Sequence, residues 1–197
     1  MNITAIYGSP RVHGNSNALT DRLTQRMEEK GASVQRFHLN TMNYRGCQGC
    51  MGCKTPESHG CILKDDLTEV LNTIPDADVL LISSAVYYGD VTSQAKGFID
   101  RFYSFYKPEF WLKPDKTRLK PGKKLVFILT QGNADEALYS GIASKYHALL
   151  GIHGFEECHT IRGCGVFMLG DAMNRPDVLV QIDQTADALF NSVSSKG

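Results

Sequence analysis

The sequence predicts an α/β fold in which a five-stranded parallel sheet is doubly wound, with helices on both faces. The first observation is that short apolar runs alternate with helical patterns along the 197 residues. This order indicates parallel strands joined by right-handed crossover helices. The second is the run at 78–84, DVLLISS, which is short, bounded and apolar, as expected of a strand covered on both faces. Ligands of such sheets bind at the carboxyl ends of the strands.

Residues 2–7 predict the first strand. Leu19, Leu23 and Met27, spaced four apart, place an apolar stripe on a helix over 16–30, and Gly31 ends that helix. The later elements are a strand at 33–39, a helix after residue 66, strands at 78–84 and 124–130, helices at 93–105 and 135–150, a weak strand at 155–161 and a last helix at 177–193.

The chain is expected to form one domain over 1–197, with a cysteine loop at 45–61 and an excursion at 106–122 rich in Pro, Lys and aromatic residues. Lys+Arg and Asp+Glu both total 21, so neither a nucleic-acid partner nor an anionic membrane surface is indicated. The N-terminus lacks the pattern of a signal peptide, and no apolar run approaches the length of a membrane span. A cytoplasmic protein is expected, in which stable disulfides are rare.

The loop after the first strand, GSPRVHGNSN at 8–17, carries no acidic residue and runs into a helix. A helix N-terminus offers unpaired backbone N–H groups and a partial positive charge, which suit a phosphate dianion. The loop lacks both the Lys of a Walker loop and the GxGxxG of a dinucleotide site. The alternative is that Asn15 or Ser16 only caps the helix. The candidate phosphate ligands are Ser9, Arg11, Asn15, Ser16 and Asn17.

GSPRVHGNSN resembles the phosphate loop of the flavodoxin-like FMN reductase superfamily. Residues 84–101, SAVYYGDVTSQAKGFIDR, look like its second signature, and 130–132, TQG, look like its third loop. The resemblance covers 1–135. It implies a flavodoxin-like fold that binds FMN, with the phosphate on the loop at 8–17. It also implies that the isoalloxazine ring lies along Ala85, Val86, Tyr87, Tyr88 and Gly89, with Thr130, Gln131 and Gly132 opposite. For Tyr87 and Tyr88 the alternative to a flavin contact is ordinary packing.

Four cysteines follow the second strand with the spacing C-x2-C-x2-C-x7-C, namely Cys47, Cys50, Cys53 and Cys61. The C-x2-C-x2-C part is the spacing of bacterial ferredoxins, in which each thiolate binds a different iron of a [4Fe-4S] cluster. Free or redox-active thiols, zinc and disulfides are the alternatives. His59 is a candidate to replace one of the four cysteine ligands, although a single loop His is more often solvated. The pattern resembles the iron–sulfur flavoprotein branch of the same superfamily.

Several residues near these motifs have expected structural roles. Gly46, Gly49 and Gly52 remove side chains where the cysteine loop wraps closely. Asp65 and Asp66 are expected to cap the helix that follows, with Glu69 completing a capping box. Lys96, Asp100 and Arg101 are expected to form a structural cluster or a subunit contact, and Cys158 and Cys164 to be core or loop thiols.

The predicted function is that of an FMN-dependent oxidoreductase. It would take electrons from NAD(P)H or a reduced protein donor and pass them to a flavin, a quinone or another small oxidant. No catalytic side chain is expected, because the chemistry belongs to the cofactor. The alternatives are an electron-transfer carrier without NAD(P)H turnover and a non-catalytic FMN-binding or quinone-sensing module. The resemblance implies a homodimer or homotetramer. The excursion around Phe110 and Trp111 is a candidate for a subunit contact or for a substrate lid, and ordinary local packing is the alternative.

Overall fold

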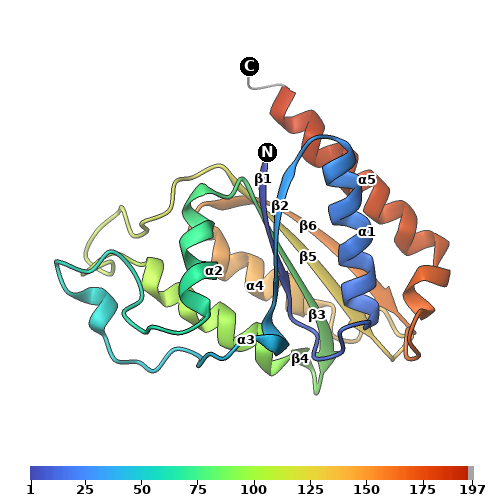
Figure 1. Cartoon of the computed structure of the whole chain (residues 1–197), viewed down its shortest axis with the longest axis horizontal. Helices are drawn as coiled ribbons and strands as arrows, with labels where there is room; N and C mark the ends of the chain where they lie inside the picture. The colour runs from blue at the N-terminus through green and yellow to red at the C-terminus, as the bar shows by residue number, and fades with distance from the viewer. Residues whose placement is uncertain (195–197) are drawn as a thin grey trace.

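A computed structural model describes residues 1–194 of the chain, with side chains up to residue 191. The last three residues of the predicted domain lie outside the described part. Five parallel strands form a twisted sheet in the order β2-β1-β3-β5-β6 (Figure 1). These strands are β1 (Asn2–Tyr7), β2 (Ser33–His38), β3 (Val79–Tyr87), β5 (Lys123–Gln131) and β6 (Phe155–Cys164). The expected five-stranded parallel sheet is therefore confirmed.

A short strand was not predicted. β4 (Asp90–Val91) pairs antiparallel with the end of β3. The connection turns at Tyr88 and Gly89, which both have positive φ angles, 50° and 87°. Glycine adopts this conformation readily and tyrosine does not. The hairpin extends β3 beyond the sheet at its carboxyl end.

Helices cover both faces of the sheet. On one face lie α1 (Asn15–Glu29) and α5 (Pro176–Ser194), and on the other lie α2 (Leu67–Thr73), α3 (Ser93–Asp100) and α4 (Gly141–Gly151) (Figure 1). Side chains along a strand alternate between faces. Val79 and Leu81 of β3 accordingly join one core, and Leu80 and Ile82 join the other. Short 3-10 helices complete the chain: η1 (Leu39–Thr41), η2 (Gly52–Lys54), η3 (Ile74–Asp76), η4 (Arg101–Phe105) and η5 (Asp171–Asn174).

The sequence predicted the order of these elements but misplaced some of their ends. The helix expected at 93–105 is α3 followed by η4, and the helix expected at 135–150 begins only at Gly141. Residues 133–135 are instead tied to the end of β5 by the Gln131 amide, which donates to the carbonyl oxygens of Asn133 and Asp135 at 3.0 and 2.9 Å. These hydrogen bonds hold residues 133–135 against the end of β5.

The predicted capping box of Asp66 and Glu69 is wrong. The Asp66 carboxylate accepts the backbone N–H of Asn43 at 2.6 Å and does not cap α2. Asp65 and Thr68 interact instead, because the Thr68 hydroxyl accepts the Asp65 N–H at 3.3 Å while the Thr68 N–H donates to the Asp65 carbonyl. Only one half of a capping box is therefore present, one residue earlier than expected, because the Thr68 N–H bonds the Asp65 backbone carbonyl and not its carboxylate.

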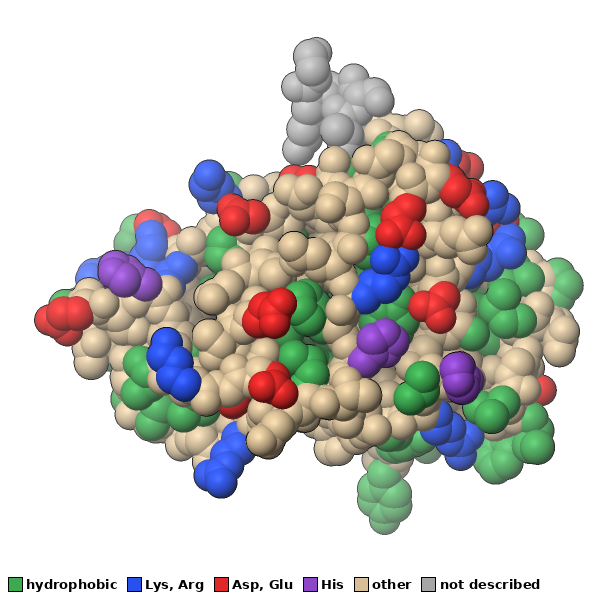
Figure 2. Space-filling view, viewed as in Figure 1, with side chains coloured by type: hydrophobic (Ala, Val, Ile, Leu, Met, Phe, Trp, Pro, Cys, Tyr) green, Lys and Arg blue, Asp and Glu red, His purple; other side chains and the backbone are tan. Residues whose placement is uncertain are grey.

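Charged side chains of both signs are interspersed on the face shown in Figure 2, in keeping with a net charge of zero. Within residues 1–194, none of the helices is both long and apolar enough to cross a bilayer. The excursion at 106–122 contains no named helix or strand, only an isolated bridge between Tyr106 and Thr117.

Candidate functional site

A cavity of about 230 Å³ lies at the carboxyl ends of the strands, where three loops meet. The loop after β1 forms one wall, and the ends of β3 and β5 with the loop after β6 form the other. This is the edge at which parallel sheets bind ligands. The lining residues are Ser9, Arg11, Gly14, Asn15, Ser16, Ala85, Val86, Tyr87, Thr130, Gly132, Val166 and Phe167.

Close packing and an internal amide fix the shape of the loop after β1. A methyl group on Gly8 would lie 2.6 Å from the Ser83 carbonyl oxygen, so the chain passes β3 only with glycine there. The Asn17 side chain donates to the carbonyl oxygens of Arg11 and Val12 at 3.1 and 3.0 Å. Asn17, expected to contact phosphate, therefore shapes the loop from within and does not line the cavity.

The start of α1 carries no side-chain cap. Its N-cap is Gly14, and neither Asn15 nor Ser16 caps the helix, so the capping alternative is wrong. The Asn15 amide instead fastens a distant loop, donating to the Met168 carbonyl at 2.9 Å and accepting the Ala172 N–H at 3.1 Å.

Ser16 is the clearest candidate for a ligand contact. Its hydroxyl is buried, its side chain is 1% exposed, and its oxygen has no hydrogen-bond partner among the described residues. A buried hydroxyl without a partner is costly. An anion in the cavity would satisfy it. Arg11 supplies positive charge, and the cavity lining contains no acid. The donor set therefore fits a phosphate group.

Not every residue expected along the ring lines the cavity. Tyr87 does, but the Tyr88 side chain is fully exposed, and Gly89 forms the turn of the hairpin. The Gln131 amide holds the loop at 133–135, and its oxygen accepts a hydrogen bond from Arg162 at 2.8 Å. Gln131 therefore supports the cavity from outside.

Val166 and Phe167 were missed by the sequence reasoning, although both line the cavity. A methyl group on Gly132 would lie 2.9 Å from the Phe167 ring, so the two residues pack closely. Phe167 begins a run of three exposed apolar residues with Met168 and Leu169. That run after a strand was the available signal, because exposed apolar clusters often mark functional surfaces.

The four cysteines of the loop at 45–61 also gather around one cavity, of about 20 Å³. All four are free; Cys53 is buried, Cys61 half-buried, and Cys47 and Cys50 exposed. In residues 1–194, no three His, Cys, Asp or Glu side chains are grouped so that they could hold one metal ion. The donor set, four thiols with no carboxylate in the lining, fits an iron–sulfur cluster. The volume admits about one water molecule.

Of the three glycines expected to let the cysteine loop pack closely, only Gly52 stands at a close contact; Gly46 has ordinary van der Waals room for a methyl group, and Gly49 is favoured by its positive φ angle. A methyl group on Gly46 would lie 3.5 Å from the Gly97 Cα atom of α3. Gly49 has a φ of 61°. A methyl group on Gly52 would lie 2.2 Å from the Ile62 Cδ1 atom.

Arg101 joins the two ends of the cysteine loop. Its side chain is 1% exposed, and it donates to the Asp65 carboxylate at 2.8 and 3.2 Å and to the Arg45 carbonyl at 2.9 Å. Burial would raise the pKa of Asp65, but hydrogen bonds from Arg101 and from backbone N–H groups outweigh it and hold that pKa below its usual value. Arg101 also lines the cysteine cavity. The structural role expected of Arg101 is confirmed, whereas Lys96 and Asp100 form an exposed i,i+4 pair.

The excursion at 106–122 packs on the cysteine loop. The Lys54 amine donates to the carbonyl oxygens of Tyr103 and Tyr106 at 2.6 and 2.7 Å, and it lies 4.4 Å from the centre of the Tyr103 ring. Arg118 donates to the Cys53 carbonyl at 2.9 Å. Phe110 stacks on Tyr106, with ring centres 4.2 Å apart. Burial lowers the pKa of Lys54.

The remaining thiols and the candidate histidine lie where the sequence suggested. Cys164 is buried and Cys158 half-buried, and burial raises the pKa of both thiols. His59 is exposed and does not line the cysteine cavity. The cysteine cavity and the cavity at the strand ends share no lining residue. In Figure 1 the cysteine loop extends away from the end of the sheet where β4 lies.

The strand order and the ligand cavity at the strand ends define a protein of the flavodoxin-like class. Residues 1–140 match the sequence profile of a family described as NADPH-dependent FMN reductase. The chain belongs to that family.

Several curated relatives are named iron–sulfur flavoproteins. An iron–sulfur flavoprotein of Archaeoglobus fulgidus is 32% identical over 105 residues, 53% of this chain and 47% of the relative. One of Methanosarcina thermophila is 26% identical over 154 residues, 78% of this chain and 75% of the relative. This chain thus spans about half the length of the Archaeoglobus relative. Among solved structures, the NAD(P)H:quinone oxidoreductase of Methanothermobacter marburgensis superposes with a TM-score of 0.71 at 20% identity, covering 94% of this chain and 95% of that one. That likeness supports the shared fold.

Proposed function

We propose that this protein is an FMN-dependent oxidoreductase. It passes electrons from NAD(P)H or a reduced protein donor to a flavin, a quinone or another small oxidant. One observation supports the proposal: one end of the cavity at the strand ends contains no acid and is lined by Arg11 and by Ser16, whose buried hydroxyl has no partner among the described residues, at the uncapped start of α1. Membership of the FMN reductase family supports the same cofactor.

The residues that line the cavity would bind and orient the cofactor, and the cofactor itself would exchange the electrons. Ser9, Arg11 and Ser16 would hold the FMN phosphate, and the ring would lie between Ala85–Tyr87 and Thr130–Gly132. Bound FMN supplies two-electron exchange with a nicotinamide and one- or two-electron exchange with acceptors. Apart from the Tyr87 phenol, the lining of the ring end has no titratable side chain. The protein therefore acts there by backbone contacts and by excluding water with Val166 and Phe167.

A second candidate function is that of an iron–sulfur flavoprotein, an electron carrier without NAD(P)H turnover. The specific observation is that the four cysteines line one cavity, and the relatives' printed names support it. Cys47, Cys50, Cys53 and Cys61 would hold a [4Fe-4S] cluster, which supplies one-electron chemistry when bound. Arg101 and Lys54 would bring positive charge to that group.

Anaerobic purification followed by counts of flavin, iron and acid-labile sulfide per chain tests both candidates. The reductase proposal expects about one FMN per chain and bleaching of the flavin absorbance by NADH or NADPH. Flavin with iron and sulfide, but no bleaching by either nucleotide, favours the carrier. A chain without FMN and without affinity for it overturns both.

We also propose that the protein is a homodimer or homotetramer. The support is the exposed apolar run of Phe167, Met168 and Leu169 beside the cavity, together with the fully exposed Tyr88. Sedimentation velocity of the full chain tests this, and a Met168→Glu, Leu169→Glu double variant should shift the protein toward a monomer. A wild-type monomer at micromolar concentration would contradict it.

A further inference from the structure

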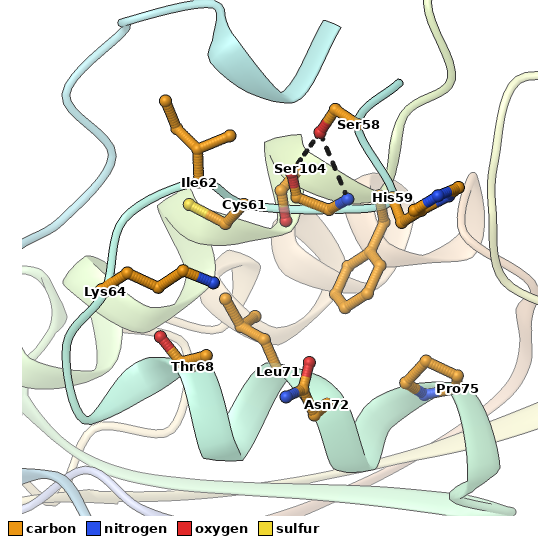
Figure 3. A pocket seen from close by; sticks show the side chains of 12 residues that line it. Ser58, His59, Cys61, Ile62, Lys64, Thr68, Leu71, Asn72, Pro75 and Ser104 are labelled. Carbon is orange, nitrogen blue, oxygen red and sulfur yellow. Dashed lines mark hydrogen bonds between the residues drawn. The ribbon is translucent and has the colours of Figure 1, made fainter. Parts of the chain in front are cut away.

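A pocket of about 400 Å³ lies between the segment at 58–64 and helix α2, away from the flavin cavity. Figure 3 shows Cys61, Ile62 and Ser104 on one side of it and Leu71, Asn72 and Pro75 on the other. The pocket shares no lining residue with the cavity at the strand ends. Its lining is Ser58, His59, Gly60, Cys61, Ile62, Lys64, Thr68, Leu71, Asn72, Pro75, Ser104 and Phe105.

The pocket is built for a molecule with one charged end and an apolar body. Its lining contains Lys64 and no acid. None of the ion pairs among the described residues involves Lys64, and Figure 3 shows its amine directed into the pocket. Leu71 and Phe105, each 6% exposed, supply the apolar floor. A lysine repels metal cations, and an apolar floor does not suit a small inorganic ion.

Ser104 gives a second, independent indication. Its side chain is 3% exposed, and its hydroxyl has no hydrogen-bond partner among the described residues. A buried hydroxyl without a partner is costly, and a ligand that accepts its hydrogen bond removes that cost. Ser104, Cys61 and Ile62 line this pocket and also the cysteine cavity. An occupant of the pocket would thus contact the wall of the cysteine site.

We propose that this pocket is a second ligand site, for a small organic anion: a carboxylate or sulfonate on an apolar body of about one ring. The anionic group meets Lys64, the Ser104 hydroxyl donates to the ligand, and the body covers Leu71 and Phe105. The site does not depend on FMN chemistry, since the two pockets have separate linings. Its occupant shields Cys61 whether the cysteines hold a cluster or remain thiols.

The test is a ¹⁹F NMR titration of the full chain, saturated with FMN, with 4-fluorobenzoate as the probe. FMN saturation removes the flavin cavity as a competing site, and an unchanged flavin spectrum during the titration checks this. Lys64→Met and Ser104→Ala are the test variants, and Lys120→Met, which removes another exposed lysine, is the matched control. Flavin retention and circular dichroism confirm that each variant is folded.

We expect saturable binding that Lys64→Met weakens roughly tenfold, because a charge-assisted hydrogen bond is lost. We expect Ser104→Ala to weaken it severalfold and Lys120→Met to leave it unchanged. The uncharged 4-fluorobenzyl alcohol should bind more weakly than the benzoate. Absence of saturable binding, or equal loss in the Lys64 and Lys120 variants, overturns the proposal. So does binding that shifts no amide signal among Gly60, Lys64 and Ser104 in a ¹⁵N spectrum.

Discussion

Arg101 and Asp65 form a two-pronged ion pair at 2.8 and 3.2 Å, with the arginine side chain 1% exposed and the aspartate 16%. Arg101 stands at the end of α3, and Asp65 follows the last cysteine of the loop by four residues. The same guanidinium donates to the Arg45 carbonyl at the start of the loop. One buried arginine therefore closes the cysteine loop at both ends.

Arg101→Met should lower the free energy of unfolding at pH 7 by about 3 kcal/mol, because it leaves a mostly buried carboxylate without its partner. The pKa of Asp65 lies below its usual value, so the pair's contribution is present above about pH 4 and is lost as the pH falls through the depressed pKa. Denaturant unfolding of the wild type and of Arg101→Met across this pH range measures the contribution of the pair to stability. Lys96→Met, which breaks an exposed pair, should cost less than about 1 kcal/mol. Equal costs for the two variants would contradict a buried, closing role for Arg101.

His153 makes stability depend on pH in the neutral to mildly acidic range. It is 2% exposed, and burial together with nearby Lys54 lowers its pKa from 6.5 to about 4. The unfolded chain binds a proton below about pH 6.5 while the folded chain does not, so stability falls as the pH drops from there to about 4. Between pH 7 and pH 5 this histidine should cost about 2 kcal/mol.

The comparison for that measurement is His153→Gln, whose amide can still contact the Thr117 hydroxyl, 3.0 Å from the histidine Nδ1 atom. The variant should lose about 2 kcal/mol less than the wild type over the same pH interval. Urea unfolding at several pH values gives both curves. Parallel curves would mean that His153 titrates normally in the folded protein.

Ser16→Ala tests the phosphate end of the flavin cavity. The Ser16 hydroxyl has no partner among the described residues, so its removal should leave the flavin-free protein as stable as before, or slightly more stable. The FMN complex should weaken by about tenfold, the value of a hydrogen bond to a charged group. Fluorescence titration with FMN measures the affinity, and Ser144→Ala on the exposed face of α4 is the control. An unchanged FMN affinity would remove Ser16 from the phosphate site.

Sequence reasoning recovered the sheet and the helices around it because these patterns are local. The apolar stripe of Leu19, Leu23 and Met27 and the buried run of β3 each reflect a single element. The sequence also predicted a ligand site at the strand-end loops, because parallel strands end at a common edge of the sheet.

The exact roles of polar side chains did not follow from the sequence, because they depend on residues far away along the chain. Asn15 holds the carbonyl of Met168, 153 positions later, and Asp65 pairs with Arg101, 36 positions later. Val166 and Phe167 enter the cavity only because β6 ends beside β5. An amide or carboxylate that a motif suggests as a ligand contact can thus already be engaged in hydrogen bonds within the folded chain.

Gly52 and Ile62 offer a paired test of the cysteine loop. A methyl group on Gly52 would lie 2.2 Å from the Ile62 Cδ1 atom and 2.8 Å from its Cγ1 atom, so Gly52→Ala should displace the Ile62 side chain and disturb the neighbouring Cys53 and Cys61. We expect this variant to incorporate less iron and sulfide in anaerobic reconstitution, with FMN binding unchanged, because the two cavities have separate linings. Ile62 is half exposed at 50%, so Ile62→Ala alone should be mild. The double variant should recover most of the lost iron, since the small side chain makes room for the methyl group. If Gly52→Ala loads iron as the wild type does, or if Ile62→Ala does not rescue it, the close packing of these two residues does not control the cysteine site.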